Sequence, residues 1–232
     1  MKIVLITIAD GAAYWDYARN MFASAKEYFP RHDQITFTER PFKATSTFLR
    51  GNEYHLQIAS RGYPGATLYR YHAFLQYEHW LNKYDYVFYC DADMEFVAPV
   101  GDIFAPLVAV LHPGYLGTRG TPEDRPQSAA YCTNNGAYYA GGFQGGESVA
   151  YLSAAKDMAG KITEDALRQI TAVWHDESHW NHYLANLPTN DRLLALGPSY
   201  CFPEGSKQAY PPILIALDKR KRGNHPRFPS AC

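Results

Sequence analysis

The sequence predicts an α/β protein in which a mixed sheet is flanked by helices. A β-branched run at Lys2–Ile8 has the content of a buried strand, and it is followed by the turn Ala9–Gly11 and a helix-like segment. A second run, Tyr86–Cys90, is almost wholly apolar and aromatic, as expected of a strand covered on both faces. A strand, a turn and a helix is how nucleotide-binding α/β folds begin, although the G-x-G-x-x-G dinucleotide fingerprint is absent.

Composition excludes several classes of protein. Of the 232 residues, 47% are hydrophobic and 19% are charged, which is typical of a globular protein and not of a disordered one. The formal net charge of −1 provides no overall basic field, so we expect no nucleic-acid partner and no attraction to an acidic membrane. Because no linker or internal repeat is visible, we expect a single domain over residues 1–232.

The cysteines and the hydropathy of the chain indicate the cellular compartment in which the protein is expected. Four dispersed cysteines form no C-x-x-C pair and are expected to be free thiols in a reducing compartment, with one disulfide as the alternative. The chain has no apolar run of about 18 residues, and its N-terminus lacks the architecture of a signal peptide. We therefore predict a soluble, cytoplasmic protein without a transmembrane anchor.

The N-terminal part should contribute two further elements and then a loop-rich stretch. A helix is expected at about Tyr14–Phe29, stopped by Pro30, and a strand at Gln34–Thr38. Residues 40–66 are rich in proline and glycine and are expected to be mostly loop, with a candidate strand around Tyr54–Ala59.

A long helix is expected at Thr67–Lys83, because apolar side chains recur on one broad side of it. Arg70 lies in the first turn of this helix, where a cation opposes the helix dipole. A partner carboxylate or phosphate would offset that cost, and a solvated arginine is the alternative.

Two carboxylates directly follow the run Tyr86–Cys90. Asp91 and Asp93 are one residue apart, so on an extended backbone they point to the same side and converge on one bound object. Hard oxygen ligands at the carboxyl end of a strand suit Mn²⁺ or Mg²⁺, with a phosphate-bearing ligand completing the coordination. The alternative is a solvated turn with two acids, because D-x-D occurs often by chance.

The middle of the chain combines an apolar run with segments rich in glycine. The run Phe104–Leu111 ends at His112, and residues 115–136 are predicted to form a long functional loop. Tyr138–Gly146 is the densest glycine cluster, which would either permit close approach of the backbone to a ligand or form only a tight turn.

Helices are predicted up to Leu187, and turn residues dominate from Pro188 onward. The helices are expected at Glu147–Ala159, Thr163–Val173 and Glu177–Leu187, with Asp176 capping the third. The run Asp218–Arg222 (DKRKR) is basic. It is either a solvated end or a segment that folds over a bound diphosphate and neutralises it.

The segment Trp174–His179 gathers two histidines and two carboxylates. His175 and His179 are spaced like half of a zinc helix, but the H-E-x-x-H motif requires glutamate directly after the first histidine. Glu177 would serve better as a carboxylate that faces a developing positive centre, such as an oxocarbenium-like sugar carbon. A zinc hydrolase and a buried polar cap are the alternatives.

Five motifs in order along the chain resemble those of glycosyltransferase family 6, the family of the blood-group A and B transferases and the α-1,3-galactosyltransferases. The motifs are Tyr89–Phe96 (YCDADMEF), Leu111–Tyr115 (LHPGY), Arg125–Tyr131 (RPQSAAY), Tyr138–Phe143 (YYAGGF) and Ala172–His179 (AVWHDESH). The resemblance is strong over about residues 67–187 and thinner at both ends. Five ordered motifs are far more specific than a single D-x-D.

This resemblance implies a GT-A fold, in which a Rossmann-like nucleotide-sugar-binding mixed sheet is flanked by helices. It implies a nucleotide-binding lobe at about 1–97, an acceptor-binding lobe at about 98–217 and a basic lid at about 218–232. It also implies a UDP-sugar donor and Mn²⁺, with Mg²⁺ as the second choice, bridging the D-x-D to the diphosphate. The implied reaction transfers α-GalNAc or α-Gal with retention to the 3-OH of a β-galactoside, plain or fucosylated, as in the short bacterial or phage-type members that lack a membrane anchor.

The resemblance also assigns roles to individual residues. Glu177 matches the carboxylate that acts as nucleophile or ion-pair stabiliser, and Asp91 and Asp93 match the metal ligands. The residues matched to acceptor binding are His112, Thr121, Trp174 and Glu204. The residues matched to donor binding are Ala9, Asp10, Gly11, Tyr14, Arg70, Asp91, Ala92, Asp93, Ala140, Gly141, Gly142, Asp176, Lys219 and Arg222.

The match to the family leaves two positions in doubt and predicts which donor sugar is preferred. Ala9 replaces an aromatic residue that is frequent in the family, which puts base stacking at that position in doubt. The register of the basic tail is ambiguous. Small residues at Ala140–Gly142 go with N-acetylgalactosamine in the family, so UDP-GalNAc is expected to be preferred over UDP-Gal. The alternatives are another retaining GT-A transferase with a different sugar and acceptor or, from another class, a zinc-dependent hydrolase or a glycosidase with paired carboxylates.

Overall fold

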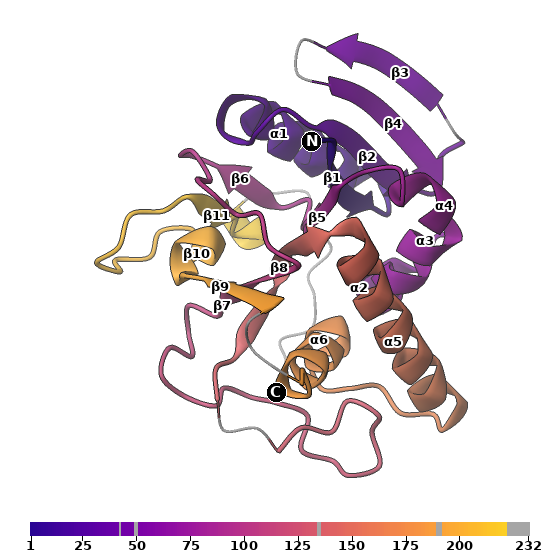
Figure 1. Ribbon diagram of the computed structural model, residues 1–232, viewed down its shortest axis with the longest axis vertical. Coiled ribbons are helices and arrows are strands. Elements are labelled where there is room, and N and C mark those ends of the chain that lie inside the picture. Colours follow the sequence, from indigo (N-terminus) through magenta and orange to yellow (C-terminus); the bar gives the residue numbers. More distant parts are fainter. Residues whose placement is uncertain (42, 49–50, 134–135, 189–191, 222–232) are drawn as a thin grey trace.

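The structure, a computed structural model, describes residues 1–232 except 42, 49–50, 134–135, 189–191 and 222–232 (Figure 1). The described strands form an eight-stranded mixed sheet and a small three-stranded sheet. In spatial order the large sheet consists of β3 (Lys43–Phe48), β4 (Gly51–Gln57), β2 (Asp33–Thr38), β1 (Ile3–Ala9), β5 (Tyr86–Cys90), β8 (Tyr139–Glu147), β7 (Leu107–Leu111) and β9 (Leu193–Leu196). The small sheet consists of β10 (Phe202–Pro203), β11 (Leu214–Ala216) and β6 (Met94–Phe96).

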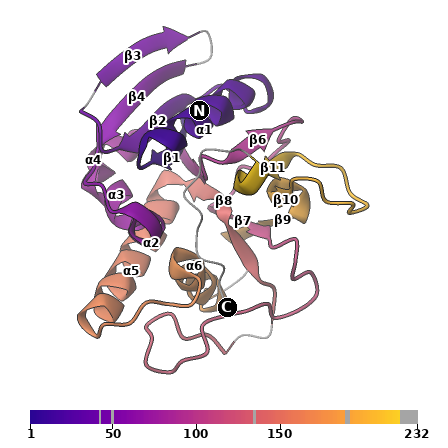
Figure 2. The same ribbon diagram turned by 180° about the vertical axis from the view of Figure 1, so that it is seen from behind.

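Helices cover both faces of the large sheet (Figures 1 and 2). The α-helices are α1 (Ala12–Tyr28), α2 (Gly62–Leu68), α3 (Arg70–Gln76), α4 (Glu78–Leu81), α5 (Ser148–Leu167) and α6 (His175–Ala185), and the short 3₁₀ turns are η2 (Pro198–Cys201) and η3 (Lys219–Lys221). Strand β1 shows why the fold is layered, since its side chains alternate between two cores. Val4 and Ile6 pack into the cluster that contains Phe74 of α3, whereas Leu5 packs into the cluster that contains Met21 of α1.

The strand directions gather the ends of two strands at one edge. Strands β4, β2, β1 and β5 run parallel, and β8 runs antiparallel to both β5 and β7. The carboxyl ends of β1 and β5 therefore lie side by side, and Asp10 and Asp91 directly follow them. In open α/β sheets this edge is where ligands bind.

Several predicted elements are confirmed and others are corrected. The strands at the N-terminus, at 34–38 and at 86–90, and the first helix, lie where the sequence predicts them. Residues 67–83 do not form one helix, because the backbone leaves helical geometry at Tyr69 (φ −97°, ψ 19°) and at Tyr77 (φ −118°, ψ 24°). The break at Tyr69 begins a new helix at Arg70, whose side chain enters the interior. Strand β3 lies within residues 40–66, which the sequence predicts to be mostly loop.

Two helices predicted at 147–159 and 163–173 are one helix, α5, which ends at Leu167. The segment after it is not helical because its backbone groups bind the 115–136 loop. The Arg125 guanidinium donates to the Thr171 carbonyl at 2.7 Å, and the Val173 N–H donates to Glu123 at 2.8 Å. Helix α6 begins at His175, so Asp176 lies inside its first turn and is not the cap.

The glycine cluster is a strand and not a tight turn. It forms β8, which lies between β5 and β7. Its glycines allow close packing of the neighbouring backbones: a Cβ at Gly145 would lie 2.5 Å from the Val87 carbonyl oxygen, and one at Gly146 would lie 2.2 Å from the Pro106 carbonyl oxygen. This mixed sheet with helices on both faces has the architecture of the GT-A fold that the family resemblance implies.

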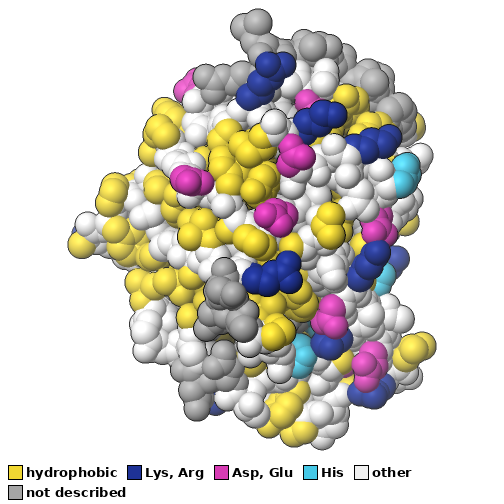
Figure 3. Space-filling view, viewed as in Figure 1, with side chains coloured by type: hydrophobic (Ala, Val, Ile, Leu, Met, Phe, Trp, Pro, Cys, Tyr) yellow, Lys and Arg dark blue, Asp and Glu magenta, His cyan; other side chains and the backbone are white. Residues whose placement is uncertain are grey.

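The described surface carries charges of both signs, and the three described cysteines are free thiols. Basic and acidic side chains are interspersed over the face seen in Figure 3. Within the described part of the chain, none of the helices combines the length and apolar character needed to cross a membrane. Cys90, Cys132 and Cys201 are free thiols, and Cys232 lies outside the described residues.

Candidate active site

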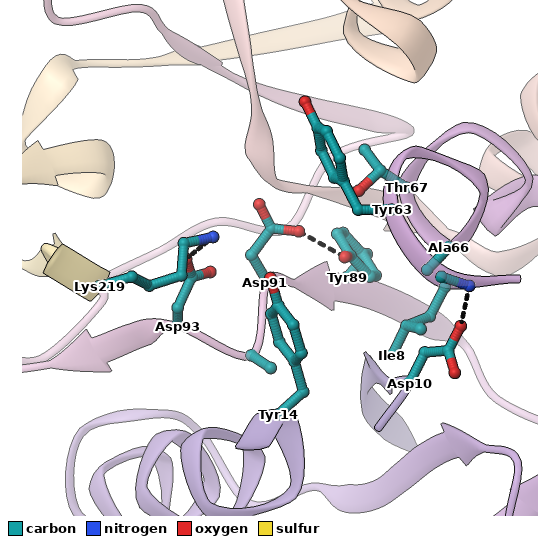
Figure 4. Close-up of a pocket in the computed structure, with 12 residues that line it drawn as sticks. Ile8, Asp10, Tyr14, Tyr63, Ala66, Thr67, Tyr89, Asp91, Asp93 and Lys219 are labelled. Carbon is teal, nitrogen blue, oxygen red and sulfur yellow. Dashed lines mark hydrogen bonds and ion pairs between the residues drawn. The ribbon is translucent and has the colours of Figure 1, made fainter. Parts of the chain in front are cut away.

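A cavity of about 300 Å³ opens at the carboxyl ends of β1 and β5 (Figure 4). Tyr14 of α1 lies on one side of it, and Tyr63 and Thr67 of the α2 segment lie on the other. Its lining contains six of the residues predicted to bind the donor: Asp10, Tyr14, Asp91, Ala92, Asp93 and Lys219.

A buried arginine connects this cavity to β8 and α6. Arg70 is 3% exposed, and its guanidinium lies 3.3 Å from Asp91 Oδ1 and 3.1 Å from Asp176 Oδ2. Its Nη1 also donates to the Gly141 carbonyl at 2.9 Å. The expectation of partner carboxylates for Arg70 is therefore confirmed, and the alternative of a solvated arginine is wrong. One cation orders two carboxylates that lie far apart in the sequence.

The acidic side chains around Arg70 outnumber its single positive charge, and their crowding together with burial raises their pKa values. Burial raises the pKa of Asp176 to about 7, with Asp91 and Glu177 acting in the same direction and Arg70 opposing. Burial likewise raises the pKa of Asp91, with Arg70 opposing and Asp93 adding to the rise. The Tyr89 hydroxyl donates a hydrogen bond to Asp91 (Figure 4). Such a site favours a ligand that brings positive charge.

Asp93 is paired with a cation from the C-terminal segment. Lys219 Nζ lies 2.8 Å from Asp93 Oδ2, and this ion pair with Asp93 raises the pKa of Lys219 against the effect of its burial (Figure 4). The basic segment thus reaches the cavity through Lys219, whereas Arg222 lies outside the described residues.

The two aspartates fit a hard divalent cation, because both offer carboxylate oxygens to the cavity and an ammonium group already occupies one of them. The described residues hold no group of three or more His, Cys, Asp or Glu side chains suited to a metal. A cation at Asp91 and Asp93 would therefore take its other oxygen ligands from a bound molecule and from water.

Glu177 lies against β8 with both carboxylate oxygens hydrogen-bonded. Oε1 accepts from the Tyr138 hydroxyl at 2.8 Å, and Oε2 accepts from the Gly141 N–H at 2.8 Å. Burial raises the pKa of Glu177, and the two hydrogen bonds oppose that rise. The carboxylate is thus held in one orientation beside Asp176 and Arg70.

The small residues of β8 let these carboxylates approach the strand. A Cβ at Gly141 would lie 3.2 Å from Asp176 Oδ2, and one at Gly142 would lie 3.3 Å from Asp91 Oδ2. Ala140 is 2% exposed. Any larger side chain at either glycine would displace a carboxylate of the site.

The end of β1 organises the other wall of the cavity. The Asp10 carboxylate accepts hydrogen bonds from the Ser60 hydroxyl at 2.6 Å and from the Gly62 N–H at 2.8 Å, and so fixes the start of α2. Gly11 has φ +94°, which favours glycine at this turn. Ala9 is 1% exposed and packs in a small cluster with Tyr17 and Ala92, so its side chain is buried beneath the cavity.

Three of the residues predicted to bind the acceptor lie around α6 and the 115–136 loop. Thr121 lines a second cavity of about 720 Å³, bounded by residues 119–125, 171–173 and 175. The Thr121 hydroxyl donates to the Tyr115 hydroxyl at 3.4 Å, and the Tyr115 ring lies 4.7 Å from the His112 ring. Trp174 is 40% exposed. Glu204, by contrast, lies directly after β10 in the small sheet and accepts the Asp218 N–H at 2.6 Å, at the start of the C-terminal segment.

The two histidines of a zinc helix do not converge. The His175 ring packs against the Tyr63 ring at 5.5 Å. His179 is fully buried, with Nε2 3.6 Å from Asp165, and burial lowers its pKa to about 4. The two imidazole rings lie in different surroundings and do not face one common site, so the structure does not support a zinc site formed by this histidine pair.

Sequence reasoning missed three tyrosines of the site. Tyr138 is buried against Glu177, Tyr89 is hydrogen-bonded to Asp91, and Tyr63 lines the cavity on the side opposite Tyr14 (Figure 4). The spacing of Tyr89, two residues before Asp91 on an extended strand, places both on one side and is a signal that could have found it. No comparable local signal marks Tyr138, because its partner lies on α6.

Comparison with known proteins supports the family resemblance. The model of glycosyltransferase family 6 matches residues 2–218. Histo-blood group ABO system transferase 1 of Rattus norvegicus is 39% identical over 130 residues, which cover 53% of this chain and 36% of that protein. Transferase 2 of the same system and organism is 38% identical over 130 residues, covering 53% of this chain and 38% of that protein. The match thus spans little more than a third of these relatives, but the family model covers almost the whole chain, and the chain belongs to glycosyltransferase family 6.

Proposed function

We propose that this chain is a retaining glycosyltransferase that moves α-GalNAc from UDP-GalNAc to the 3-OH of a β-galactoside, plain or fucosylated, with UDP-Gal as the weaker donor. The observation that carries the proposal is the buried Arg70, which lies between Asp91 and Asp176 and bonds the strand that also holds Glu177. In this arrangement, Asp91, which would bind the metal and diphosphate, and Glu177, which would face the anomeric carbon of the sugar, belong to one site.

The donor would lie along the cavity from β1 to β8. We place its nucleoside end beside Tyr14 and Asp10, within a nucleotide lobe at about 1–97, and its diphosphate beside Asp91, Asp93 and Lys219. Mn²⁺ bound at Asp91 and Asp93, or Mg²⁺ in its place, would supply Lewis-acid stabilisation of the departing diphosphate. Lys219 belongs to the proposed lid at about 218–232, of which residues 222–232 lie outside the described residues, and it would place a second positive charge beside the departing diphosphate.

Glu177 would act at the anomeric carbon. In the transfer, the bond from the anomeric carbon to the diphosphate oxygen breaks, and its electron pair leaves with UDP. Positive charge develops at the carbon, and the Glu177 carboxylate stabilises it by ion pairing or by forming a transient bond. The acceptor hydroxyl then forms the new bond to the anomeric carbon, any transient bond to Glu177 breaks with its electron pair returning to the carboxylate, and the hydroxyl proton passes to the departing diphosphate. We place the acceptor beside His112, Thr121 and Trp174, within a lobe at about 98–217.

The donor preference rests on β8. Gly141 and Gly142 carry no side chains and the Ala140 side chain is buried, so β8 places no side chain of its own between the strand and the carboxylates of Asp176 and Asp91. Small residues at these positions go with N-acetylgalactosamine in the family, and we infer that the acetamido group at C2 of the donor sugar lies beside this strand. Contacts with that group would be worth about 1–3 kcal/mol of discrimination, roughly 10–200-fold in donor preference.

The test is release of UDP from equal concentrations of UDP-GalNAc and UDP-Gal, with and without Mn²⁺ and with plain and fucosylated β-galactosides. We expect release to require Mn²⁺, to rise with acceptor and to favour UDP-GalNAc. Asp93→Asn should lower the rate about 10–100-fold or more, whereas the control Asp16→Asn, on the exposed side of α1, should not. Full activity in EDTA would refute the metal role, and release that is indifferent to acceptor would point to a hydrolase.

A further inference from the structure

Tyr138 lies where the donor side and the acceptor side of the site meet. It is 2% exposed and directly precedes β8. Its hydroxyl donates to Glu177 Oε1 at 2.8 Å. Its ring packs edge-on against the His112 ring at 5.7 Å and the Tyr115 ring at 5.3 Å, so one side chain contacts both the reactive carboxylate and the acceptor-side loop.

The Tyr138 ring is held in place by the 115–136 loop. Gly120 has φ +64°, and a Cβ at this position would lie 2.4 Å from the Cγ atom of the Tyr138 ring. Only a glycine allows the loop to pass so close to the ring. The Tyr138 hydroxyl is therefore aimed at Glu177 by packing on several sides, as a group that must hold another in place should be.

Two donors fix the Glu177 carboxylate, and only one of them is a side chain. The Gly141 N–H holds Oε2 at 2.8 Å and the Tyr138 hydroxyl holds Oε1 at 2.8 Å. Together they set the plane of the carboxylate and favour its ionised form within a buried site. Removal of the Tyr138 hydroxyl would leave Oε1 without this donor and let the carboxylate rotate about its bond to the Gly141 amide.

We propose that Tyr138 is a positioning residue for the transfer reaction, which holds Glu177 in its working orientation and ties that orientation to the acceptor-side loop. The inference rests on the proposed role of Glu177 at the anomeric carbon. Tyr138 has no contact with the donor in this scheme, so its contribution appears in turnover and not in nucleotide binding.

The test is Tyr138→Phe, which keeps the ring and removes only the hydroxyl. UDP release from the donor should slow about 10–100-fold, by analogy with residues that orient a working ligand, while UDP affinity with Mn²⁺, measured by calorimetry, should stay within about twofold. The acidic limb of the kcat–pH profile should move to higher pH, because Glu177 loses a donor to its charged form. Tyr139→Phe is the matched control: its ring packs against the main core, and kcat should remain at the wild-type level.

Glu177→Gln separates failure of this inference from failure of the proposed function. A large fall in kcat for Glu177→Gln together with wild-type kcat and pH profile for Tyr138→Phe would overturn the positioning role alone. Wild-type kcat for Glu177→Gln would overturn the proposed role of Glu177 at the anomeric carbon and the inference with it, whereas release of UDP that is indifferent to acceptor would overturn the proposed transfer reaction itself. If both hold, adding Tyr138→Phe to Glu177→Gln should cost little further activity, because the two residues act through one carboxylate.

Discussion

Replacing Arg70 with methionine should destabilise the ligand-free protein far more than the loss of one surface charge would. Methionine has a similar length and fills much of the same space, but it leaves Asp176, with an exposed side-chain fraction of 2%, without its counter-charge at 3.1 Å. The Gly141 carbonyl also loses the donor that lies 2.9 Å away. Removing one partner of a buried ion pair typically costs about 3–5 kcal/mol in free energy of unfolding.

This penalty should depend on pH in a specific way. The pKa of Asp176 is about 7 in the wild-type protein and must rise further when Arg70 is absent. Below the wild-type pKa, Asp176 is largely protonated in both proteins, so little charge is left uncompensated. At pH values between the two pKa values, Asp176 keeps its proton in the folded Arg70→Met variant but has lost it in the folded wild-type protein. The difference in unfolding free energy therefore grows as pH rises above about 7 and levels off above the pKa of the variant.

Urea unfolding in EDTA at about pH 6 and pH 9 would measure this difference directly. Arg61→Met is the matched control, because Arg61 is exposed and stacks over the Tyr69 ring at 4.3 Å. Its loss should cost about 1 kcal/mol or less at either pH. A penalty for Arg70→Met below about 1 kcal/mol at pH 9, or one that shrinks with rising pH, would show that Arg70 does not neutralise buried charge.

The remaining predictions concern Lys219 and His179. Lys219→Met should tighten Mn²⁺ binding in the absence of nucleotide about two- to fivefold, because Asp93 is freed from a partly exposed ion pair. The same substitution should weaken UDP binding. Calorimetric titrations with Mn²⁺ and with UDP measure the two effects separately, and weaker Mn²⁺ binding would contradict the reasoning. Burial lowers the pKa of His179 from 6.5 to about 4, so the unfolded chain binds the proton first and stability should fall by up to about 3 kcal/mol as pH drops through this window. His179→Gln should flatten that slope in urea unfolding, and an unchanged slope would assign the acid sensitivity to other groups.

The sequence predicts the parts of this fold that local pattern decides. Strands β1 and β5 are found almost to the residue, because a short β-branched or aromatic run between turns has few other solutions. The helix at 67–83 has a continuous apolar side, yet it breaks at Tyr69. The break brings Arg70 to Asp91 and Asp176, and such tertiary contacts override a helix pattern that is satisfactory on its own.

Asp176 shows the same limit within the site. Its position before a helical pattern suits an N-cap, and a cap is the commonest role for aspartate there. In the structure the Asp176 carboxylate pairs with Arg70. At the start of α6, the Ser178 hydroxyl accepts a hydrogen bond from the Trp174 N–H at 3.0 Å. Local chemistry identifies a carboxylate near a helix start but not its partner, because that partner lies on another helix.

Among the described residues, the two cations of the site, Arg70 and Lys219, differ in how firmly they are held, and this difference bears on the proposed metal dependence of the transfer. Arg70 is 3% exposed and is shared between two carboxylates and a strand carbonyl, so it is part of the folded framework. Lys219 is about a third exposed and comes from the C-terminal segment, where its ammonium group contacts the Asp93 carboxylate at 2.8 Å and lies over the Tyr14 ring at 5.5 Å. A divalent cation at Asp91 and Asp93 would compete with Lys219 for Asp93 and with Arg70 for Asp91, but Arg70 would keep its contacts with Asp176 and the Gly141 carbonyl. Lys219 would then be available to the proposed diphosphate, whereas Arg70 would remain between Asp176 and β8.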